Sequence, residues 1–433
     1  MDKIESLIVS IHQPGPEDIT DAYLDGDRVF VRGTAGAALR SRDFRVVWLG
    51  IFASNIGTWM QNVLLGAYGF ALTGSTTFVA ILFFCQLGPL LFLSNIGGVI
   101  ADRFDRRAFL LVCQVQQLIF SIFLALLVFS DHPNEVVLAV CVLAIGFGNA
   151  LGAPALNAIL PTLTPRDDLA GAVALQSVQM NLSRVIGPAI GAAIYAAFGP
   201  SPVFFLNSAT YLFAITALVV VKYPRHPADS RKQKVMAQFT EGFRVVRGDP
   251  VLRRVLGILV TFSFFSLVFI GLMPVLAAHD LAMGLRSIEY GLLYGIFGLG
   301  AAVGAISVGT LFSHQSKARL VRPGLVAFSI LLAGFGLART SLVAFMIAPA
   351  LGYAYFLVIT SLSTVLQERV DDAYRGRVMA LWVMAFGGTV PLGVLLAGPV
   401  VQATSITFVV LVGAGVSLAL VLWADLVKVG APG

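Results

Sequence analysis

Charged residues are scarce in this sequence, and the few present avoid its long apolar stretches. Only 12% of the 433 residues are Asp, Glu, Lys or Arg, whereas 58% are hydrophobic. Soluble globular domains carry about 25% charged residues, so this balance excludes an ordinary soluble protein. The net charge of +6 is spread over short loops and does not form one basic patch. We therefore expect an integral membrane protein with the lipid bilayer around it and no nucleic-acid partner.

Cysteine and histidine are also rare. The three cysteines, Cys85, Cys113 and Cys141, lie inside apolar runs, which excludes a disulfide framework and favours small core residues. The five histidines fall in the tail or in loops, so no pair at helical spacing can bind a metal. The sequence contains no Walker loop and no G-x-S-x-G elbow. It predicts neither an enzyme nor an ATP-driven pump, and no cofactor, with a proton gradient left open as the energy source.

Two glycine-rich strings, GFGNALG (146–152) and GLGAAVG (298–304), partly match a dinucleotide-binding fingerprint. Both lie inside apolar runs of membrane length, without the strand or the acidic residue that the fingerprint needs. Close packing of helices through small residues explains them better.

The sequence is rich in apolar runs of about 18 or more residues, the length that spans a bilayer. Together they predict an all-α membrane protein with 12 transmembrane helices in two six-helix pseudo-repeats. We place the runs at Phe44–Leu72, Thr76–Ala101, Ala108–Ser130, Val136–Leu160, Leu169–Phe198, Val203–Val221, Val255–Ala278, Ser287–Phe312, Leu320–Ala338, Leu342–Leu366, Ala373–Val400 and Ile406–Leu426. The expected domains are a mostly disordered cytoplasmic tail (1–43), an N-terminal bundle (44–221), a cytoplasmic linker (222–254), a C-terminal bundle (255–426) and a cytoplasmic C-terminus (427–433).

The distribution of basic residues predicts the orientation. About 26 of the 29 lysines and arginines lie in, or within a few residues of, the tail, the loops after even-numbered runs (the linker included) or the C-terminus. The opposite loops hold only Arg286 and Arg339, and Arg184 lies within a run. Because basic residues collect on the cytoplasmic side, both termini should face the cytoplasm. No cleavable signal peptide is expected at the N-terminus.

A weak internal echo supports two related bundles. The segment PRDDLAGAVAL precedes the fifth run and VDDAYRGRVMAL precedes the eleventh. They align Asp167 with Asp372 and Gly171 with Gly376, at equivalent places in the two halves. Parallel repeats of this kind occur in transporter folds built from two bundles.

The segment GGVIADRFDRR (97–107) packs five charged residues between the second and third runs. It resembles the G-x-L-A-D-R-x-G-R-R/K signature of the major facilitator superfamily, with Ile100 at the Leu position and Asp105 at a Gly position. The resemblance implies a gate lock on the cytoplasmic side, and the alternative is an ordinary charged loop. The gating residues implied are Gly98, Asp102, Arg103, Arg106 and Arg107, and the partners expected around the start of the eleventh helix are Glu368, Arg375 and Arg377.

Arg184 lies 12 to 15 residues into the fifth run, near the middle of the membrane. An arginine there costs about 2.5–3.5 kcal/mol on insertion scales, so it should face a partner or a wet cavity. The following RVIGPAIGAA resembles the G-P-x-x-G antiporter motif of the same superfamily, with Ala192 at the second Gly; its expected helix-packing residues are Gly187, Pro188 and Gly191. Arg184 either binds negative charge in a central cavity or bonds neighbouring helices.

Polar side chains elsewhere in the runs are candidates for the cavity wall. The first run carries a stripe at helical spacing, and the fifth and sixth runs add an amide each. These residues are Asn55, Thr58, Gln61, Asn62, Asn181 and Asn207. Amides inside a span suit hydrogen bonding to a substrate or between helices equally well.

Acidic residues are missing from the middle of every run. Proton-coupled members of the superfamily usually carry one there, so coupling would have to use Asp102, Glu289 or protonation of the substrate.

Stretches such as SRVIGPAIG (183–191) and RGRVMAL (375–381) resemble the bacterial efflux branch that contains drug, macrolide and siderophore exporters. The resemblance implies a monomeric secondary transporter in the cytoplasmic membrane, exporting a small amphipathic organic compound by alternating access. Uptake or facilitated diffusion of a small organic anion, and a transport-inactive scaffold, are the alternatives.

Overall fold

The computed structural model describes residues 34–130, 132–221, 223 and 235–430. Helices dominate this described part of the chain, which contains no strand. Ten of the described helical segments are long and apolar enough to cross a membrane. The prediction of an all-helical membrane protein is therefore confirmed. Most of the expected tail and much of the expected linker lie outside the described residues.

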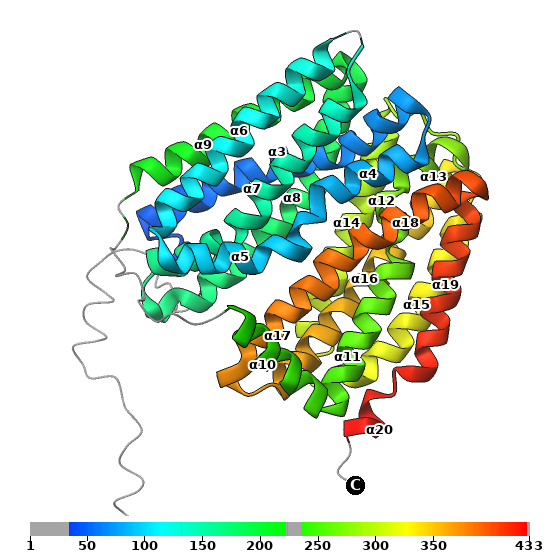
Figure 1. The fold of residues 1–433 in the computed structure, drawn as a ribbon. Helices are drawn as coiled ribbons and strands as arrows, with labels where there is room; N and C mark the ends of the chain where they lie inside the picture. The colour runs from blue at the N-terminus through cyan, green and yellow to red at the C-terminus, as the bar shows by residue number, and fades with distance from the viewer. Residues whose placement is uncertain (1–33, 131, 222, 224–234, 431–433) are drawn as a thin grey trace, which may run out of the picture.

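The helices form two groups, coloured blue to green and green to red in Figure 1. We call the first group the N-half and the second the C-half. The N-half contains α2 (Ala35–Ala38), α3 (Arg42–Thr73), α4 (Thr76–Leu87), α5 (Pro89–Arg103), α6 (Arg106–Phe129), α7 (Glu135–Ile159), α8 (Leu169–Phe198) and α9 (Pro200–Val220), with the short 3-10 turns η2 (Leu160–Leu163) and η3 (Arg166–Asp168).

The C-half is built in the same way from long helices and short connections. It contains α10 (Val235–Gly248), α11 (Pro250–Thr261), η4 (Phe262–Ser266), α12 (Val268–Gly271), α13 (Met273–His279), α14 (Ile288–Gly309), α15 (Lys317–Leu337), α16 (Ser341–Arg369), α17 (Asp372–Val383), η5 (Met384–Gly388), α18 (Thr389–Ala403), α19 (Ile406–Trp423) and α20 (Leu426–Gly430).

Local sequence signals set where the long helices begin and end. Ser41 caps α3 by accepting a hydrogen bond from the Phe44 amide at 3.4 Å, and its hydroxyl donates to the Leu163 carbonyl at 2.7 Å. Gly74 ends α3 with a φ of 65°, a left-handed conformation that glycine adopts without strain. Ser75 then caps α4 through the Phe78 amide. Two residues therefore suffice to reverse the chain.

Three of the predicted runs are interrupted. The second run is two helices, α4 and α5, which meet at Gly88 and Pro89, because proline has no amide hydrogen to continue the helix. The seventh and eleventh runs each contain a π-helical turn, η4 and η5. Such turns place an extra residue in the helix and frequently lie at functional sites.

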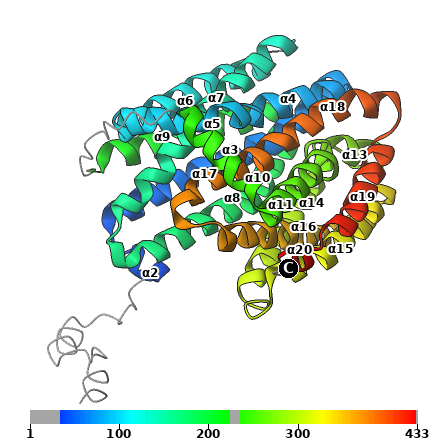
Figure 2. The ribbon, with the colours of Figure 1, turned by 60° about the horizontal axis from the view of Figure 1, so that its bottom comes forward.

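The loops define two ends of the molecule. The linker end carries α10 and the loop between α5 and α6, and the far end carries Gly74 and Gly199. Helix α10 lies beside α17 at the linker end (Figure 2). At this contact a Cβ on Gly242 would come within 3.0 Å of the Arg377 carbonyl oxygen.

The two most extensive contacts between the halves are those of α4 with α18 and of α8 with α14. A glycine makes each contact close. A Cβ on Gly398 of α18 would lie 2.6 Å from Ala80, and one on Gly291 of α14 would lie 2.7 Å from the Pro188 carbonyl oxygen. Near the far end, the Thr76 hydroxyl donates to the Gly398 carbonyl at 2.8 Å. The two halves are therefore in direct backbone contact there.

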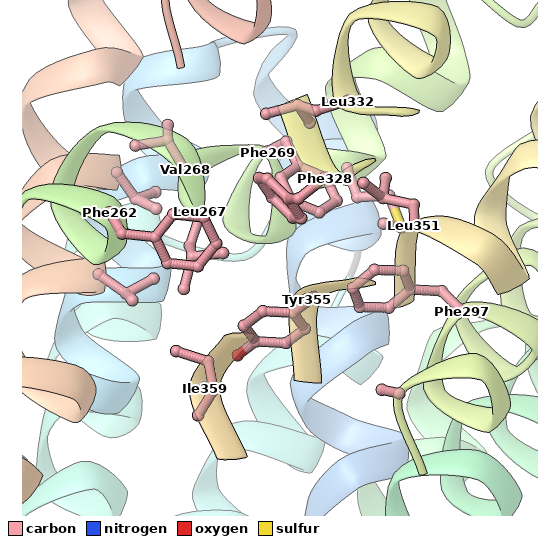
Figure 3. Close-up of a cluster of buried hydrophobic side chains, with 14 of the residues drawn as sticks. Phe262, Leu267, Val268, Phe269, Phe297, Phe328, Leu332, Leu351, Tyr355 and Ile359 are labelled. Atoms are coloured by element: carbon pink, nitrogen blue, oxygen red, sulfur yellow. The ribbon is translucent and has the colours of Figure 1, made fainter. Parts of the chain in front are cut away.

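The largest apolar core lies mainly in the C-half and is rich in aromatic rings (Figure 3). Phe262 and Phe328 pack edge to face with their ring centroids 4.8 Å apart, and Phe269 packs on Phe297 at 5.7 Å. The N-half instead has two smaller clusters, one around Phe44 near the linker end and one around Phe204 near the far end. Polar side chains, among them Gln61, Gln117 and Asn207, occupy the layer between them.

Candidate functional site

Arg184 reaches from α8 of the N-half into the space where the two halves meet. Its guanidinium carbon lies 4.9 Å from the ring centre of Trp59 on α3 and 5.6 Å from that of Phe356 on α16 of the C-half. Tyr294 and Tyr355, also from the C-half, are close enough to interact with it electrostatically. The side chain is half-buried. Arg184 is thus held between aromatic residues of both halves, and we call this group the arginine cage.

The arginine cage leaves the positive charge uncompensated. Each ring face contributes about 0.5–2 kcal/mol to holding the guanidinium. No ion pair joins Arg184 to a carboxylate within the described residues, and its buried Nε has no hydrogen-bond partner there. A half-buried cation in this situation favours an anion on any molecule that enters the space.

The motif after Arg184 packs α8 tightly against its neighbours. A Cβ on Gly187 would lie 2.7 Å from the Ile56 carbonyl oxygen of α3, and Gly191 faces Met60 one turn further on. Pro188 is buried at the contact with α14. Ala192 stands where a further glycine usually follows Gly191. Its methyl group is accommodated because Gly291 of α14 lies directly opposite.

The polar stripe of α3 is divided among three environments. Asn55 and Thr58 line a pocket inside the N-half. Gln61 is buried between helices, and Asn62 borders a small space of about 20 Å³ between the halves. Asn62 lies roughly 10 Å further along the helix than Asn55, since each residue rises 1.5 Å. Asn181 of α8 lines neither pocket and donates to the Ser177 carbonyl of its own helix at 2.9 Å.

Gln61 and Asn207 belong to one buried hydrogen-bonded cluster. The Asn207 amide of α9 donates to the Gln61 Oε1 at 2.7 Å, and Ser121 of α6 donates to the same oxygen at 3.3 Å. The Ser208 hydroxyl donates to Ser121 at 3.0 Å. The structure therefore places these two predicted cavity residues where they join three helices of the N-half.

The pocket that contains Asn55 and Thr58 has a volume of about 140 Å³, and seven of the 17 residues that line it carry amide side chains. We call it the amide pocket. Its amides come from α3, α6, α7 and α8, and the sequence analysis identified only the first of them. They are Asn55, Gln114, Gln117, Asn149, Asn157, Gln176 and Gln179. A signal was present, because Gln114–Gln117 and Gln176–Gln179 each repeat at three residues and so share a helix face.

The charged segment after α5 stabilises the N-half at the linker end. Asp105, at the glycine position of the signature, caps α6 by accepting the Ala108 amide at 2.7 Å. Arg107 donates to the Val219 carbonyl of α9 at 2.7 Å and lies over the Tyr223 ring. Arg103 lies in the last turn of α5, where a cation suits the helix dipole. The side chain of Asp102 lies outside the described residues.

The two glycines of this segment differ in their surroundings. A Cβ on Gly97 would lie 2.5 Å from the Leu151 carbonyl oxygen of α7, whereas one on Gly98 would meet only Pro154 at 3.9 Å. The close approach between α5 and α7 therefore depends on Gly97.

The predicted gate partners lie around the start of α17. Arg377 forms an ion pair of 3.0 Å with Glu241 of α10. Glu368 is exposed, and its neighbour Arg369 pairs with Asp249 at 2.9 Å. Burial raises the pKa of Asp249, but the hydrogen bond from Arg369 and those from two backbone amides outweigh it, so its pKa is below the ordinary value. Arg375 is exposed on α17.

Two groups of membrane-length helices around an uncompensated cation define a transport protein that passes small molecules through a bilayer. The chain belongs to the major facilitator superfamily. Within it, the family described as transmembrane secretion effector matches residues 33–430 of this chain. It is a secondary transporter and not an enzyme. This confirms the family and the protein class predicted from the sequence.

Curated relatives agree with this assignment. The enterobactin exporter EntS of Salmonella choleraesuis is 30% identical over 355 residues, which cover 78% of this chain and 81% of that protein. EntS of Shigella boydii serotype 4 is 29% identical over 395 residues, covering 88% of this chain and 91% of that one.

Solved structures share the fold. The nucleoside transporter NupG superposes with a TM-score of 0.72 at 13% identity, covering 90% of this chain and all of that one. An auto-inhibited peptide transporter of the POT family gives a TM-score of 0.73 at 12% identity, covering 90% and 98%. At such identities the likeness concerns the fold alone.

Proposed function

We propose that this protein exports a small amphipathic organic compound that carries negative charge. The observation that carries the proposal is the arginine cage: a cation without an acidic partner, held by aromatic rings from both halves. The rings suit the apolar part of such a compound and Arg184 suits its anionic part. Because Trp59 and Phe356 belong to different halves, relative movement of the halves takes the cage apart, which would release the compound.

The relatives and the family favour export over uptake. The similarity to enterobactin exporters supports a siderophore-like or metabolite-like substrate and a place in the bacterial cytoplasmic membrane. The family description refers to secretion. Uptake of an organic anion is the second candidate, since Arg184 would serve either direction.

Twelve spans in two pseudo-equivalent halves are part of the proposal. Helices α3 and α8, of 32 and 30 residues, are absent from the ten apolar spans because their amides and Arg184 lower their mean hydropathy. An axis that exchanges the halves would convert the contact of α4 with α18 into that of α14 with α8. Both contacts exist, and both are made by a glycine, Gly398 and Gly291. The protein would act as a monomer with both termini in the cytoplasm.

The charged segments at the linker end would form the cytoplasmic gate. We propose that Gly98, Asp102, Arg103, Arg106 and Arg107 face the start of α17 when this end closes. Two positions support this: Glu368 lies in the last turn of α16, just before α17, and Arg377 lies in the second turn of α17. Export would then be driven by proton exchange through Asp102, Glu289 or the substrate itself.

Transport by Arg184 variants tests the proposal. Metabolites inside and outside cells with and without the protein would identify the exported compound, and its flux from vesicles would then be measured for Arg184→Ala, Arg184→Lys and Arg286→Ala. Loss of one charge-assisted hydrogen bond corresponds to roughly 1.5–3 kcal/mol, so we expect Arg184→Ala to lower flux about 10- to 100-fold. Arg184→Lys should be intermediate.

Arg286 is the matched control, because it also lies over an aromatic ring, that of Tyr195 at the far end. Arg286→Ala should keep normal flux. Equal flux in all three variants at equal membrane expression would exclude the arginine cage as the substrate site.

A further inference from the structure

The amide pocket lies inside the N-half. It is enclosed by α3, α6, α7, α8 and α9, and none of its lining side chains is charged. We propose that it binds an uncharged group of about the size of one ring that carries hydroxyl or amide N–H donors. The inference rests on the proposed function, since it assigns a second part of the exported compound.

One residue that lines the pocket carries an acceptor that the described fold leaves without a partner. The Gln114 side chain is only 8% exposed, and its buried Oε1 accepts no hydrogen bond within the described residues. Buried side-chain oxygens in folded proteins almost always have a partner. In the nearby cluster of Gln61, Ser121 and Asn207 the acceptor Gln61 Oε1 receives two hydrogen bonds. Gln116 of the same helix also has a buried Oε1 without a partner, so α6 carries two acceptors that the described fold does not use, and the one on Gln114 belongs to a residue that lines the pocket.

The size and chemistry of the pocket select the class of ligand. A cavity of roughly 150 Å³ holds one benzene ring, and this one measures about 140 Å³. Amide groups both donate and accept hydrogen bonds but offer no charge to pair with an ion. A hydroxylated ring or a cyclic amide fits these conditions, whereas a bare hydrocarbon ring would leave the Gln114 oxygen unsatisfied.

The amide pocket lies next to the arginine cage. Thr58 of the pocket precedes Trp59 of the cage in α3. In α8, Gln179 and Met180 of the pocket lie one turn before Arg184, roughly 6–8 Å along the helix axis. One compound with an anionic aromatic part and a neutral, hydrogen-bonding part would reach both. The two sites together would select such a compound over a simple organic anion.

The test measures binding of resorcinol, a neutral ring with two hydroxyl donors, to the full chain in nanodiscs by saturation-transfer NMR. Its methyl-capped counterpart, 1,3-dimethoxybenzene, has the same ring without donors. The variants are Gln114→Met and, as an independent one at a half-buried position, Asn55→Ala. Gln116→Met is the matched control. Gln116 lies on the same helix and, like Gln114, has a buried Oε1 without a partner in the described chain, but it lies outside the pocket lining. Its Nε2 donates to the Ala144 carbonyl at 2.7 Å.

We expect resorcinol to bind the wild type and Gln116→Met, with at least tenfold weaker binding to Gln114→Met and to Asn55→Ala. 1,3-Dimethoxybenzene should not compete. Equal resorcinol binding by all four proteins, or no binding by the wild type, would overturn the proposal and leave the pocket filled by water only. Arg184→Ala should retain resorcinol binding within about twofold. If resorcinol binding depends on Gln114 but the protein exports no compound, the proposed function is refuted, whereas the assignment of the amide pocket as a binding site stands.

Discussion

The two halves of this transporter bury different kinds of polar side chain. In the described chain, every buried amide side chain belongs to the N-half, and every buried polar residue of the C-half is a serine. The six serines are Ser263, Ser266, Ser307, Ser329, Ser361 and Ser417. A serine can donate to a helix carbonyl without disturbing the fold, whereas an amide needs partners for two donors and an acceptor. The N-half thus carries more hydrogen-bonding capacity than its own fold uses.

Three of the six serines join helices around the aromatic core of the C-half, whereas Ser263 and Ser361 have no hydrogen-bond partner in the described chain. Ser329 of α15 donates to the Ala414 carbonyl of α19 at 2.6 Å, and Ser266 donates to the Gly413 carbonyl at 2.8 Å. These bonds stabilise the rings shown in Figure 3 without creating a polar cavity. The C-half contributes apolar walls to the shared site, chiefly through Phe356. Under the proposed function, the N-half would supply the hydrogen-bonding groups for the substrate and the C-half would supply aromatic rings that close against it.

The largest expected effect concerns the contact through which the halves meet. We expect Gly291→Leu to lower flux roughly tenfold or more, because even a Cβ there would lie 2.7 Å from the Pro188 carbonyl oxygen and overpacking costs about 1–3 kcal/mol. Vesicle flux at matched expression is the measurement. Gly415→Leu is the control, since nothing lies within 4 Å of a Cβ at Gly415. If both variants transport normally, α8 and α14 need not approach closely during the cycle.

A smaller effect should distinguish a buried amide of the N-half from a buried serine of the C-half by how much stability each contributes. Gln61→Leu removes the acceptor at 2.7 Å from the Asn207 amide and should cost about 1–3 kcal/mol of stability. Ser329→Ala should cost at most about 1 kcal/mol, because it removes only a donor to a helix carbonyl. The stabilities of the two variants would be compared by thermal unfolding in the same detergent.

The double variant Gln61→Leu with Asn207→Leu sharpens this comparison. Since both polar partners are then gone, it should recover part of the stability lost in the single variant. A double variant that loses the sum of the two single losses would show that the cluster does not act as a unit.

The smallest expected effect lies at the linker end of the C-half. The pKa of Asp249 is lowered in the folded state, so its contribution to stability is present above its unfolded pKa of about 4 and is lost as the pH falls through the folded value. Asp249→Asn can still cap α11 but loses the pair with Arg369. Because Arg369 is half exposed, the loss at pH 7 should stay below about 1 kcal/mol.

Stability of the wild type and Asp249→Asn would be measured from pH 7 to pH 3. The difference should shrink as the pH falls. A constant difference would assign the stabilisation to the cap alone.

Much of the architecture was predictable because membrane helices are encoded locally. Apolar length and the scarcity of charge indicate a membrane-spanning fold, and the signature around residues 97–107 indicates the family. Arg184 was identifiable because one cation in a long apolar run has no local explanation. The breaks at Pro89 and within α11–α13 were less predictable, since hydropathy continues through them.

Amide residues show where such prediction ends. Asn55, Gln61 and Asn62 belong to one polar stretch of α3, yet they lie in a pocket, in a hydrogen-bonded cluster and between the halves. The environment of each residue depends on which side chains α6, α9 and α14 place opposite it. In the same way, spacing alone did not indicate that Arg377 pairs with Glu241 of α10.

The sequence by itself determined that this protein lies in a lipid bilayer, that it is helical and that it carries a cation at its centre. Hydropathy and charge act residue by residue along the chain, so these properties are encoded locally. Only the tertiary structure decided which polar groups satisfy one another and which remain available, because hydrogen bonds are short and directional and depend on the packing of distant helices. The unpartnered oxygen of Gln114 and the cage around Arg184 are products of that packing.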